Sequence, residues 1–266
     1  MGDLTVGDSP VDEVRCRVHR AWGEGRSARG AFLFTRLDPV VLESIACLFD
    51  YVVIDMQHGL MDHQQMINAI RALQPGRAMA IVRVPTLDKG LIGRALDAGA
   101  MGIIVPGVET SEQAAAAVTA CRYVPGGERS YGPIGAMVRY GLDYANTANE
   151  RVLVIPMIET KLGLENAEEI CSTPGVDAIY IGPFDLSISL GGEPTSEAVD
   201  HLKPQLQHLA DVASKHGIIA GIHGTTSPWQ GYHVMGFRLI TVVTDFDVLT
   251  YGFRKAAGVE LGETGY

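Results

Sequence analysis

The chain has 266 residues, of which 47% are apolar and 20% are charged, and its formal net charge is −10. This composition supports a large buried core and excludes a disordered chain, while the acidic balance argues against nucleic acid or an anionic membrane as a partner. No apolar run reaches the roughly 18 residues of a membrane span, and we expect no signal peptide in a sequence that begins Met1-Gly2-Asp3-Leu4.

The cysteines are widely separated and form no CxxC pair. This spacing favours reduced, buried thiols in a cytoplasmic protein over disulfide bonds. The cysteines are Cys16, Cys47, Cys121 and Cys171.

Short apolar segments alternate with helical segments along the chain. An amphipathic segment from Val11 to Trp22 predicts a helix that closes one end of the fold. The predicted strands are 31–34, 51–55, 80–84, 102–106, 152–159, 178–181, 218–223 and 239–243. The predicted helices are 39–48, 64–73, 89–98, 111–121, 162–171, 185–190, 196–216, 227–235 and 245–258.

This alternation predicts a single parallel (β/α)8 barrel, the TIM barrel, with an N-terminal helix. We expect an N-terminal extension over 1–28, the barrel over 29–258 and a flexible tail over 259–266. A doubly wound open sheet is the alternative fold. It requires a Gly-rich phosphate turn after the first strand, where Thr35-Arg36-Leu37-Asp38 stands instead.

One connection is unusually long. Residues 125–149 are rich in Gly and Tyr, and their length predicts a functional loop or lid that contains short helices. Within it, Arg129-Ser130-Tyr131-Gly132 are candidates either for lining the pocket or for an oligomer contact.

Polar residues stand at the carboxyl ends of the predicted strands, which all face one mouth in a barrel. Acids, histidines and an arginine in this position predict a divalent cation with oxygen ligands, an anion-binding arginine and an acid–base histidine. Glu159 and Asp185 are the candidate metal ligands, although each alone is equally a helix cap. The residues at these ends are Asp55, His58, Arg83, Pro106, Glu159, Asp185, His223, Thr244 and Asp245.

Four segments together resemble one known family, the HpcH/HpaI aldolases, of the 4-hydroxy-2-oxoheptanedioate aldolase type. The resemblance covers roughly residues 29–255. The segments are Asp55-Met56-Gln57-His58-Gly59, Arg83-Val84-Pro85, Met157-Ile158-Glu159-Thr160 and Gly182-Pro183-Phe184-Asp185-Leu186-Ser187.

The resemblance implies a divalent-metal-dependent class II pyruvate aldolase. Glu159 and Asp185 would bind Mg²⁺, Mn²⁺ or Co²⁺, which would stabilise the enolate of a 2-oxo acid. Arg83 would hold the keto or enolate oxygen. His58 would be the acid–base group, directly or through metal-bound water, and Asp55 would orient it and favour its charged form.

The resemblance also implies a substrate-binding set at the start of one helix. Backbone N–H groups around Phe184 and Asp185 would receive the substrate carboxylate there. The full set is Arg83, Gly182, Pro183, Phe184 and Asp185.

Structural interpretations of the same residues stay open. His58 is then a loop histidine, and Arg83 is a salt-bridge residue in the mouth, which is compatible with a catalytic role. We interpret His63, His223 and His233 as structural or rim residues.

Two positions depart from the family pattern. Gln57 stands where Glu is common in an Asp-x-Glu-His pattern, and Met157 stands where a polar residue is common. Both departures concern substrate preference and pH dependence more than the reaction class.

The sequence thus predicts a carbon–carbon lyase that reversibly cleaves a 4-hydroxy-2-oxo acid to pyruvate, or a close 2-oxo acid, and an aldehyde. The alternatives are an oxaloacetate decarboxylase or a carbon–carbon bond-forming synthase that uses the same enolate. A non-catalytic barrel that binds a 2-oxo acid is the alternative from another class.

Two further expectations concern lysines and assembly. A Schiff-base mechanism requires a lysine at a strand end, and the nearest candidates, Lys89 and Lys161, stand at helix starts. The apolar C-terminal helix predicts a homo-oligomer, and the resemblance implies a hexamer.

Overall fold

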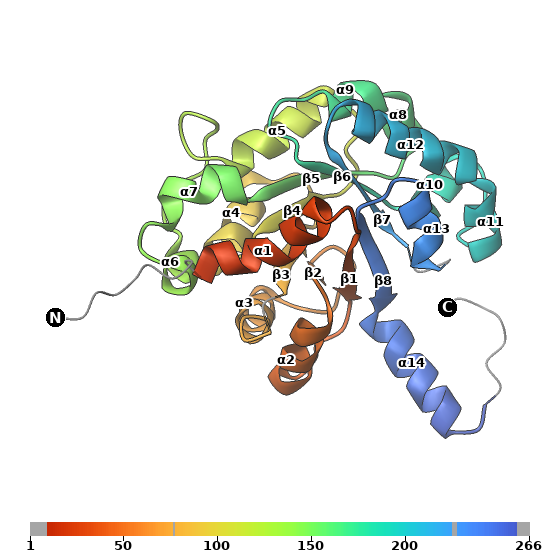
Figure 1. Ribbon diagram of the computed structural model, residues 1–266, viewed down its shortest axis with the longest axis horizontal. Helices are drawn as coiled ribbons and strands as arrows, with labels where there is room; N and C mark the ends of the chain where they lie inside the picture. Colours follow the sequence, from red (N-terminus) through yellow and green to blue (C-terminus); the bar gives the residue numbers. More distant parts are fainter. Residues whose placement is uncertain (1–9, 77, 225–227, 260–266) are drawn as a thin grey trace.

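The computed structural model describes residues 10–76, 78–224 and 228–259. Within them, eight strands close into a barrel in sequence order, and each neighbouring pair is parallel (Figure 1). The strands are Ala28–Leu33 (β1), Tyr51–Asp55 (β2), Met79–Arg83 (β3), Gly102–Val105 (β4), Leu153–Ile158 (β5), Ala178–Ile181 (β6), Ile219–His223 (β7) and Leu239–Thr244 (β8). The predicted TIM barrel is confirmed, and the open doubly wound sheet is excluded because β1 pairs with β8.

Helices surround the barrel, and most begin where the sequence predicts. The outer helices are Pro39–Leu48 (α2), His63–Ala72 (α3), Lys89–Ala98 (α4), Ser111–Cys121 (α5), Lys161–Glu165 (α8), Ala167–Cys171 (α9), Pro183–Ser189 (α10), Ser196–His201 (α11), Lys203–Lys215 (α12), Trp229–Val234 (α13) and Asp245–Ala256 (α14). Capping boxes at Asp62 and Thr110 start α3 and α5.

Two helices that the sequence predicts as continuous are broken. Asn166 separates α8 from α9, and its Nδ2 donates to the carbonyl of Glu109, 2.8 Å away. Leu202 separates α11 from α12, which begins with Pro204 in its first turn. Proline has no N–H for the preceding turn, so a new helix starts there.

The strand alternation places a layer of side chains at each depth of the barrel. Residues two apart on a strand point to the same face, and the inward face carries Phe32, Tyr51, Ile81, Ile155 and Tyr180 in its core. The same period brings Phe34, Asp55, Arg83, Met157, Gly182 and His223 to the carboxyl-terminal end. We call this end the mouth and the opposite end the base.

The base is closed by helices outside the regular alternation. They are Pro10–Gly23 (α1), Ile134–Tyr140 (α6) and Tyr144–Arg151 (α7), and α1 lies against α6 (Figure 1). Tyr140 donates to the Gly99 carbonyl at 2.8 Å, and Arg139 donates to the Ile70 carbonyl. These carbonyls lie at the ends of α4 and α3 farthest from the mouth, so α6 and α7 form no lid over the mouth and that expectation is wrong.

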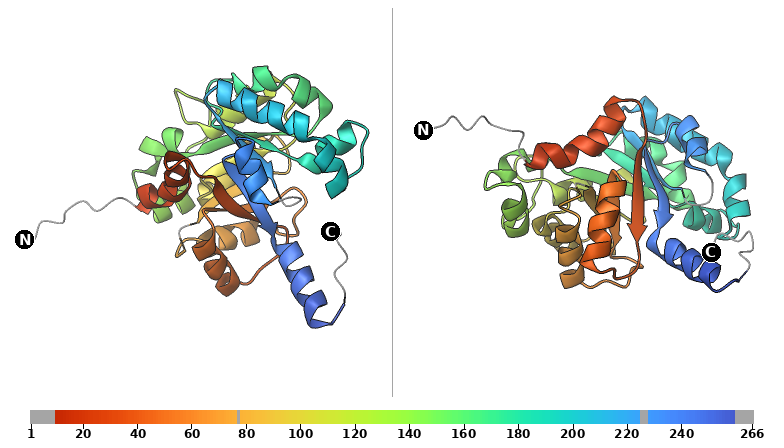
Figure 2. Two further views of the ribbon diagram at one scale, coloured as in Figure 1. Left: turned by 45° about the vertical axis from the view of Figure 1, so that its right-hand side comes forward. Right: turned by 60° about the horizontal axis from the view of Figure 1, so that its bottom comes forward.

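The last helix, α14, does not pack along the barrel as the other outer helices do. Figure 2 shows α14 continuing from β8 and extending away from the barrel, and Asp245 is its only buried residue. Four large apolar side chains along it are at least 41% exposed: Phe246, Leu249, Tyr251 and Phe253. Most of the predicted tail, residues 260–266, lies outside the described residues.

The helices and the cysteines test two expectations from composition. None of the described helices combines the length and apolar character needed to cross a bilayer. Cys47, Cys121 and Cys171 are free thiols, but only the latter two are buried, because Cys47 faces outward from α2.

Candidate active site

A buried ion pair between neighbouring strands anchors the mouth. Asp55 and Arg83 stand opposite each other in the β2–β3 register, both on the inward face. Arg83 donates through Nε to Asp55 Oδ1 at 2.8 Å and through Nη2 to Asp55 Oδ2 at 2.7 Å. Their side chains are 7% and 0% exposed, so removing either partner would strand a buried charge, at a cost of about 3–5 kcal/mol.

This pair differs from the expected arrangement of Asp55 and His58. Asp55 accepts from the backbone N–H groups of Gln57 and His58, at 3.0 and 3.2 Å, so it fixes the loop rather than the imidazole. The expected carboxylate–imidazole pair is not formed, because the carboxylate oxygens of Asp55 accept from Arg83 and from these backbone N–H groups instead. His58 is exposed on the loop after β2.

The two candidate metal ligands approach each other from β5 and α10. Glu159 is 8% exposed, and its Oε1 accepts from the Gly107 N–H at 2.8 Å. Burial, followed by the charge of Asp185, raises the pKa of Glu159 to about 7, against smaller opposing effects of Gly107 and Arg83. Asp185 lies exposed in the first turn of α10.

Gly182 leaves space for the Glu159 and Met157 side chains. A Cβ atom there would lie 2.6 Å from Met157 Cε and 2.9 Å from Glu159 Oε2. The glycine therefore lets the β6–α10 turn pass directly beside the carboxylate. Pro183 then begins α10, which has no side-chain cap at its start.

These residues fit a hard divalent cation. Glu159 is a buried carboxylate without an ion-pair partner in the described chain, because Asp55 occupies two of the three Arg83 nitrogens. A second carboxylate, Asp185, is near enough to raise its pKa. Two carboxylates with water in the remaining positions suit Mg²⁺ or Mn²⁺. No cluster of three or more His, Cys, Asp or Glu side chains with metal-binding geometry occurs among residues 10–76, 78–224 and 228–259.

The two residues that depart from the family pattern both lie at this site. The third guanidinium nitrogen of Arg83, Nη1, lies 3.9 Å from Met157 Sδ, a weak acceptor, so this edge remains available for a stronger one. The Oε1 atom of Gln57 is buried without a hydrogen-bond partner.

An aromatic wall forms another side of the mouth. His223, at the end of β7, packs its ring against Phe32 with centroids 5.0 Å apart at 83°, and lies 6.4 Å from the Phe34 ring. The Arg83 guanidinium lies 5.0 Å from the same Phe32 ring. The prediction of His223 as a structural or rim residue overlooked this wall. Its inward position two residues after Gly221 was the available signal.

Other residues singled out in the sequence lie away from this cluster or serve the backbone. Asp245 accepts from the N–H groups of Phe34 and Thr35, at 2.9 and 2.8 Å, and so ties β8 to the end of β1. His233 contacts Ser27 at 2.9 Å, before β1 at the base. Arg129 binds Asp97 and Tyr144 at the base, so it does not line the mouth.

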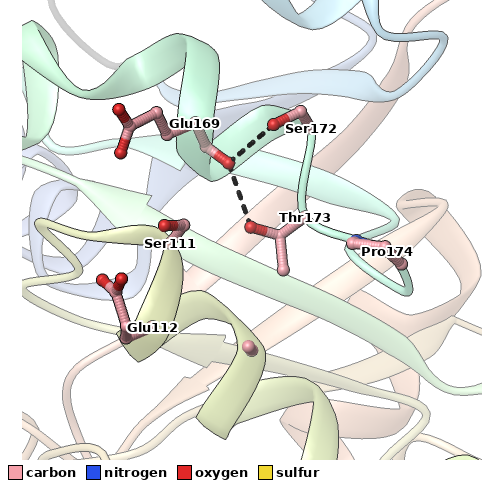
Figure 3. A pocket seen from close by; sticks show the side chains of 7 residues that line it. Ser111, Glu112, Glu169, Ser172, Thr173 and Pro174 are labelled. Atoms are coloured by element: carbon pink, nitrogen blue, oxygen red, sulfur yellow. Dashed lines mark hydrogen bonds between the residues drawn. The ribbon is translucent and has the colours of Figure 1, made fainter.

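A surface groove of about 430 Å³ between α5 and α9 is separate from the mouth (Figure 3). The hydroxyls of Ser172 and Thr173 both donate to the Glu169 carbonyl at 3.0 Å, and the Glu112 side chain lies across the groove. None of the strand-end residues lines it.

Comparisons with known proteins show the family of the chain and agree with its fold. Residues 32–249 match the family model described as HpcH/HpaI aldolase/citrate lyase. The chain is 36% identical to a hydroxypyruvate/pyruvate aldolase of Rhizorhabdus wittichii, across 90% of this chain and 96% of that one.

Solved structures show the same likeness. An HpcH/HpaI aldolase/citrate lyase family protein from Burkholderia cenocepacia J2315 superposes with a TM-score of 0.79 at 32% identity, covering 91% of this chain and 97% of that one. The citrate synthase SbnG superposes with a TM-score of 0.78 at 30% identity, covering 90% and 95%. The chain therefore belongs to the HpcH/HpaI aldolase/citrate lyase family, and it is a carbon–carbon lyase.

Proposed function

We propose that this enzyme is a divalent-metal-dependent aldolase that reversibly cleaves a 4-hydroxy-2-oxo acid to pyruvate, or a close 2-oxo acid, and an aldehyde. The observation that carries the proposal is Glu159, a buried carboxylate without a cationic partner, beside Asp185 and across the mouth from Arg83. A site built only to stabilise the barrel has no reason to leave such a carboxylate unpaired.

Glu159 and Asp185 hold the cation in this proposal, and Mg²⁺, Mn²⁺ and Co²⁺ are the candidates. When bound, the cation supplies Lewis-acid polarisation of the 2-oxo acid. The Nη1 edge of Arg83, which meets only the weak acceptor Met157 Sδ, receives the 2-oxo oxygen as negative charge develops there. The first turn of α10, at Phe184 and Asp185, faces the substrate carboxylate.

His58 is the proposed acid–base group. In cleavage it takes the proton of the C4 hydroxyl while the C3–C4 bond breaks, which releases the aldehyde and leaves the enolate of pyruvate. It then returns the proton to C3. Its imidazole has no hydrogen-bond partner in the described chain, so it is free to reach the substrate, while Asp55 positions only its backbone.

A synthase is the second candidate. It is favoured by the likeness to citrate synthase SbnG. The same enolate would then attack a different electrophile, and the residues around Arg83, Glu159 and Asp185 would serve equally. Oxaloacetate decarboxylation uses the same residues to stabilise the enolate that remains after CO₂ leaves.

The direct test is a panel of 4-hydroxy-2-oxo acids with the chelated enzyme, to which Mg²⁺, Mn²⁺ or Co²⁺ is then added. We expect metal-dependent release of pyruvate. Decarboxylation of oxaloacetate without cleavage of any panel member would favour an oxaloacetate decarboxylase and overturn the aldolase.

We also propose a homo-oligomer, a hexamer by resemblance. The supporting observation is α14, which extends away from its own barrel (Figure 2) and carries exposed apolar side chains. A monomeric mass by light scattering at micromolar concentration would contradict this. The free thiols support the cytoplasm as the compartment.

A further inference from the structure

His223 is a buried imidazole in the mouth for which the mechanism above has no use. Its side chain projects inward from the end of β7, and the residue is 8% exposed. It packs edge-on against Phe32 and also faces Phe34, so aromatic carbon surrounds it on the β1 side.

The ring nitrogens of His223 have no hydrogen-bond partner among the described residues, and neither nitrogen is sealed off as a buried unsatisfied atom. Both nitrogens are therefore open to the mouth, where water or a ligand can satisfy them. A polar ring turned to the mouth without a protein partner has the properties of a ligand contact.

The imidazole is uncharged at neutral pH. Burial and the nearby Arg83 guanidinium lower the pKa of His223 to about 4, and the Asp55 carboxylate opposes this only in part. A neutral imidazole offers one N–H donor and one acceptor nitrogen. It therefore suits an uncharged polar group, such as a hydroxyl, better than a carboxylate.

The position of the ring indicates which part of a substrate it meets. Arg83 on β3, Glu159 after β5 and Asp185 after β6 surround the 2-oxo acid in the proposed function. The arc from β7 through β8 to β1 completes the mouth, and it presents His223, Phe32 and Phe34. The part of the substrate beyond the breaking C3–C4 bond has this arc available to it.

We propose that His223 is a specificity-determining residue that hydrogen-bonds a hydroxyl group on the aldehyde fragment, so that the enzyme prefers hydroxyaldehydes over their unsubstituted analogues. This assignment rests on the proposed aldolase function. Phe34, which is partly exposed, contacts the carbon skeleton of the same fragment, and the buried Phe32 supports the His223 ring.

The test compares glycolaldehyde with acetaldehyde, which lacks the single hydroxyl, in condensation with pyruvate. We expect kcat/KM of the wild type to favour glycolaldehyde by about 10-fold or more. His223→Leu should remove that preference, and His223→Asn, which keeps a donor and an acceptor, should restore part of it. His208→Leu, on the exposed face of α12, is the control for loss of a histidine elsewhere.

Exchange of the methyl protons of pyruvate with deuterated solvent measures enolate formation at the part of the site that binds the 2-oxo acid. It should stay within about twofold of the wild type in His223→Leu, because the enolate is formed without the aldehyde. If His223→Leu keeps both the aldehyde preference and the exchange, the assignment of His223 is overturned and the aldolase function is not. An equal loss of exchange and condensation in this variant would also overturn the assignment. A wild type that neither exchanges these protons nor condenses either aldehyde would overturn the aldolase function as well.

Discussion

Both ends of the barrel bury arginines, but the two ends differ in how far their charged and polar groups are paired within the protein. At the base, Arg129 binds Asp97 at 2.9 Å and Tyr144 at 3.1 Å, and lies 4.5 Å from the Tyr123 ring centroid. Arg139 donates to the carbonyl of Ile70 and lies 5.5 Å from the Tyr140 ring centroid. These contacts join the segment between α5 and β5 to the ends of α3 and α4.

At the mouth, one arginine is paired and other polar groups are not. Arg83 satisfies Asp55, while Glu159 has no cationic partner and His223 has no hydrogen-bond partner in the described chain. At the base, the charged groups are paired within the protein and stabilise the fold. At the mouth, polar groups are available to bind ligands. Substitutions at the two ends should separate loss of stability from loss of function.

The largest contrast should come from two aspartates. Asp185→Ala should abolish divalent-metal binding and activity together, because one of two proposed ligands is lost. Asp97→Ala at the base should leave metal affinity unchanged. It should lower the free energy of unfolding by about 2 kcal/mol, since Arg129 loses a carboxylate that is itself one-third exposed. Titration calorimetry with Mn²⁺ and urea unfolding measure the two effects. Retained metal affinity in Asp185→Ala would refute the proposed ligand set.

His58→Ala should reduce kcat by about 10²–10⁴-fold, the usual contribution of a general acid–base group. Metal affinity should be unchanged because Glu159 and Asp185 remain. Steady-state cleavage at saturating metal is the measurement. Near-normal turnover would show that His58 is a loop residue and that the proton takes another route.

The uncharged state of His223 predicts a pH effect on stability. Its pKa is lowered to about 4 in the folded protein, against about 6.5 when unfolded. Between these values the unfolded chain binds more protons, so stability falls as the pH falls. The loss reaches about 2 kcal/mol by pH 5.

The matched variant for this effect is His223→Leu, which has no proton to bind at this position. Urea unfolding of both proteins at pH 7 and pH 5, in chelator, measures the difference. Parallel pH dependence of the two proteins would show that His223 is not held neutral.

The smallest effect should come from the lysines nearest the mouth. Lys89 and Lys161 have side chains 53% and 64% exposed and form surface pairs with Glu128 and Glu165. Replacing either with Met should change activity within about twofold. Borohydride treatment with substrate should trap no adduct on either lysine. A trapped adduct would replace the metal mechanism with a Schiff-base one.

Much of this arrangement could be predicted from the sequence. The alternation of apolar strands with helices identifies the barrel, and the barrel places Asp55, Arg83, Glu159 and Asp185 at one mouth. A local sequence pattern does not show which side chains on neighbouring strands bind each other. Arg83 binds Asp55 because β2 and β3 are in register, and this contact takes the carboxylate that the sequence suggested for His58.

The prediction of a lid over residues 125–149 is wrong for a similar reason. Length and composition predict an irregular functional segment, but they do not say at which end of the barrel it lies. The segment joins the end of α5 to the start of β5, so it belongs to the base, where Tyr140 and Arg139 fix it. The order of the elements was sufficient to infer this.

The most direct test of the account is exchange of the methyl protons of pyruvate with deuterated solvent, which requires enolate formation and no aldehyde. The account predicts exchange when Mg²⁺ or Mn²⁺ is added to the chelated enzyme, and much slower exchange in Arg83→Ala. Undiminished exchange in chelator, or no exchange with any divalent cation, would contradict it.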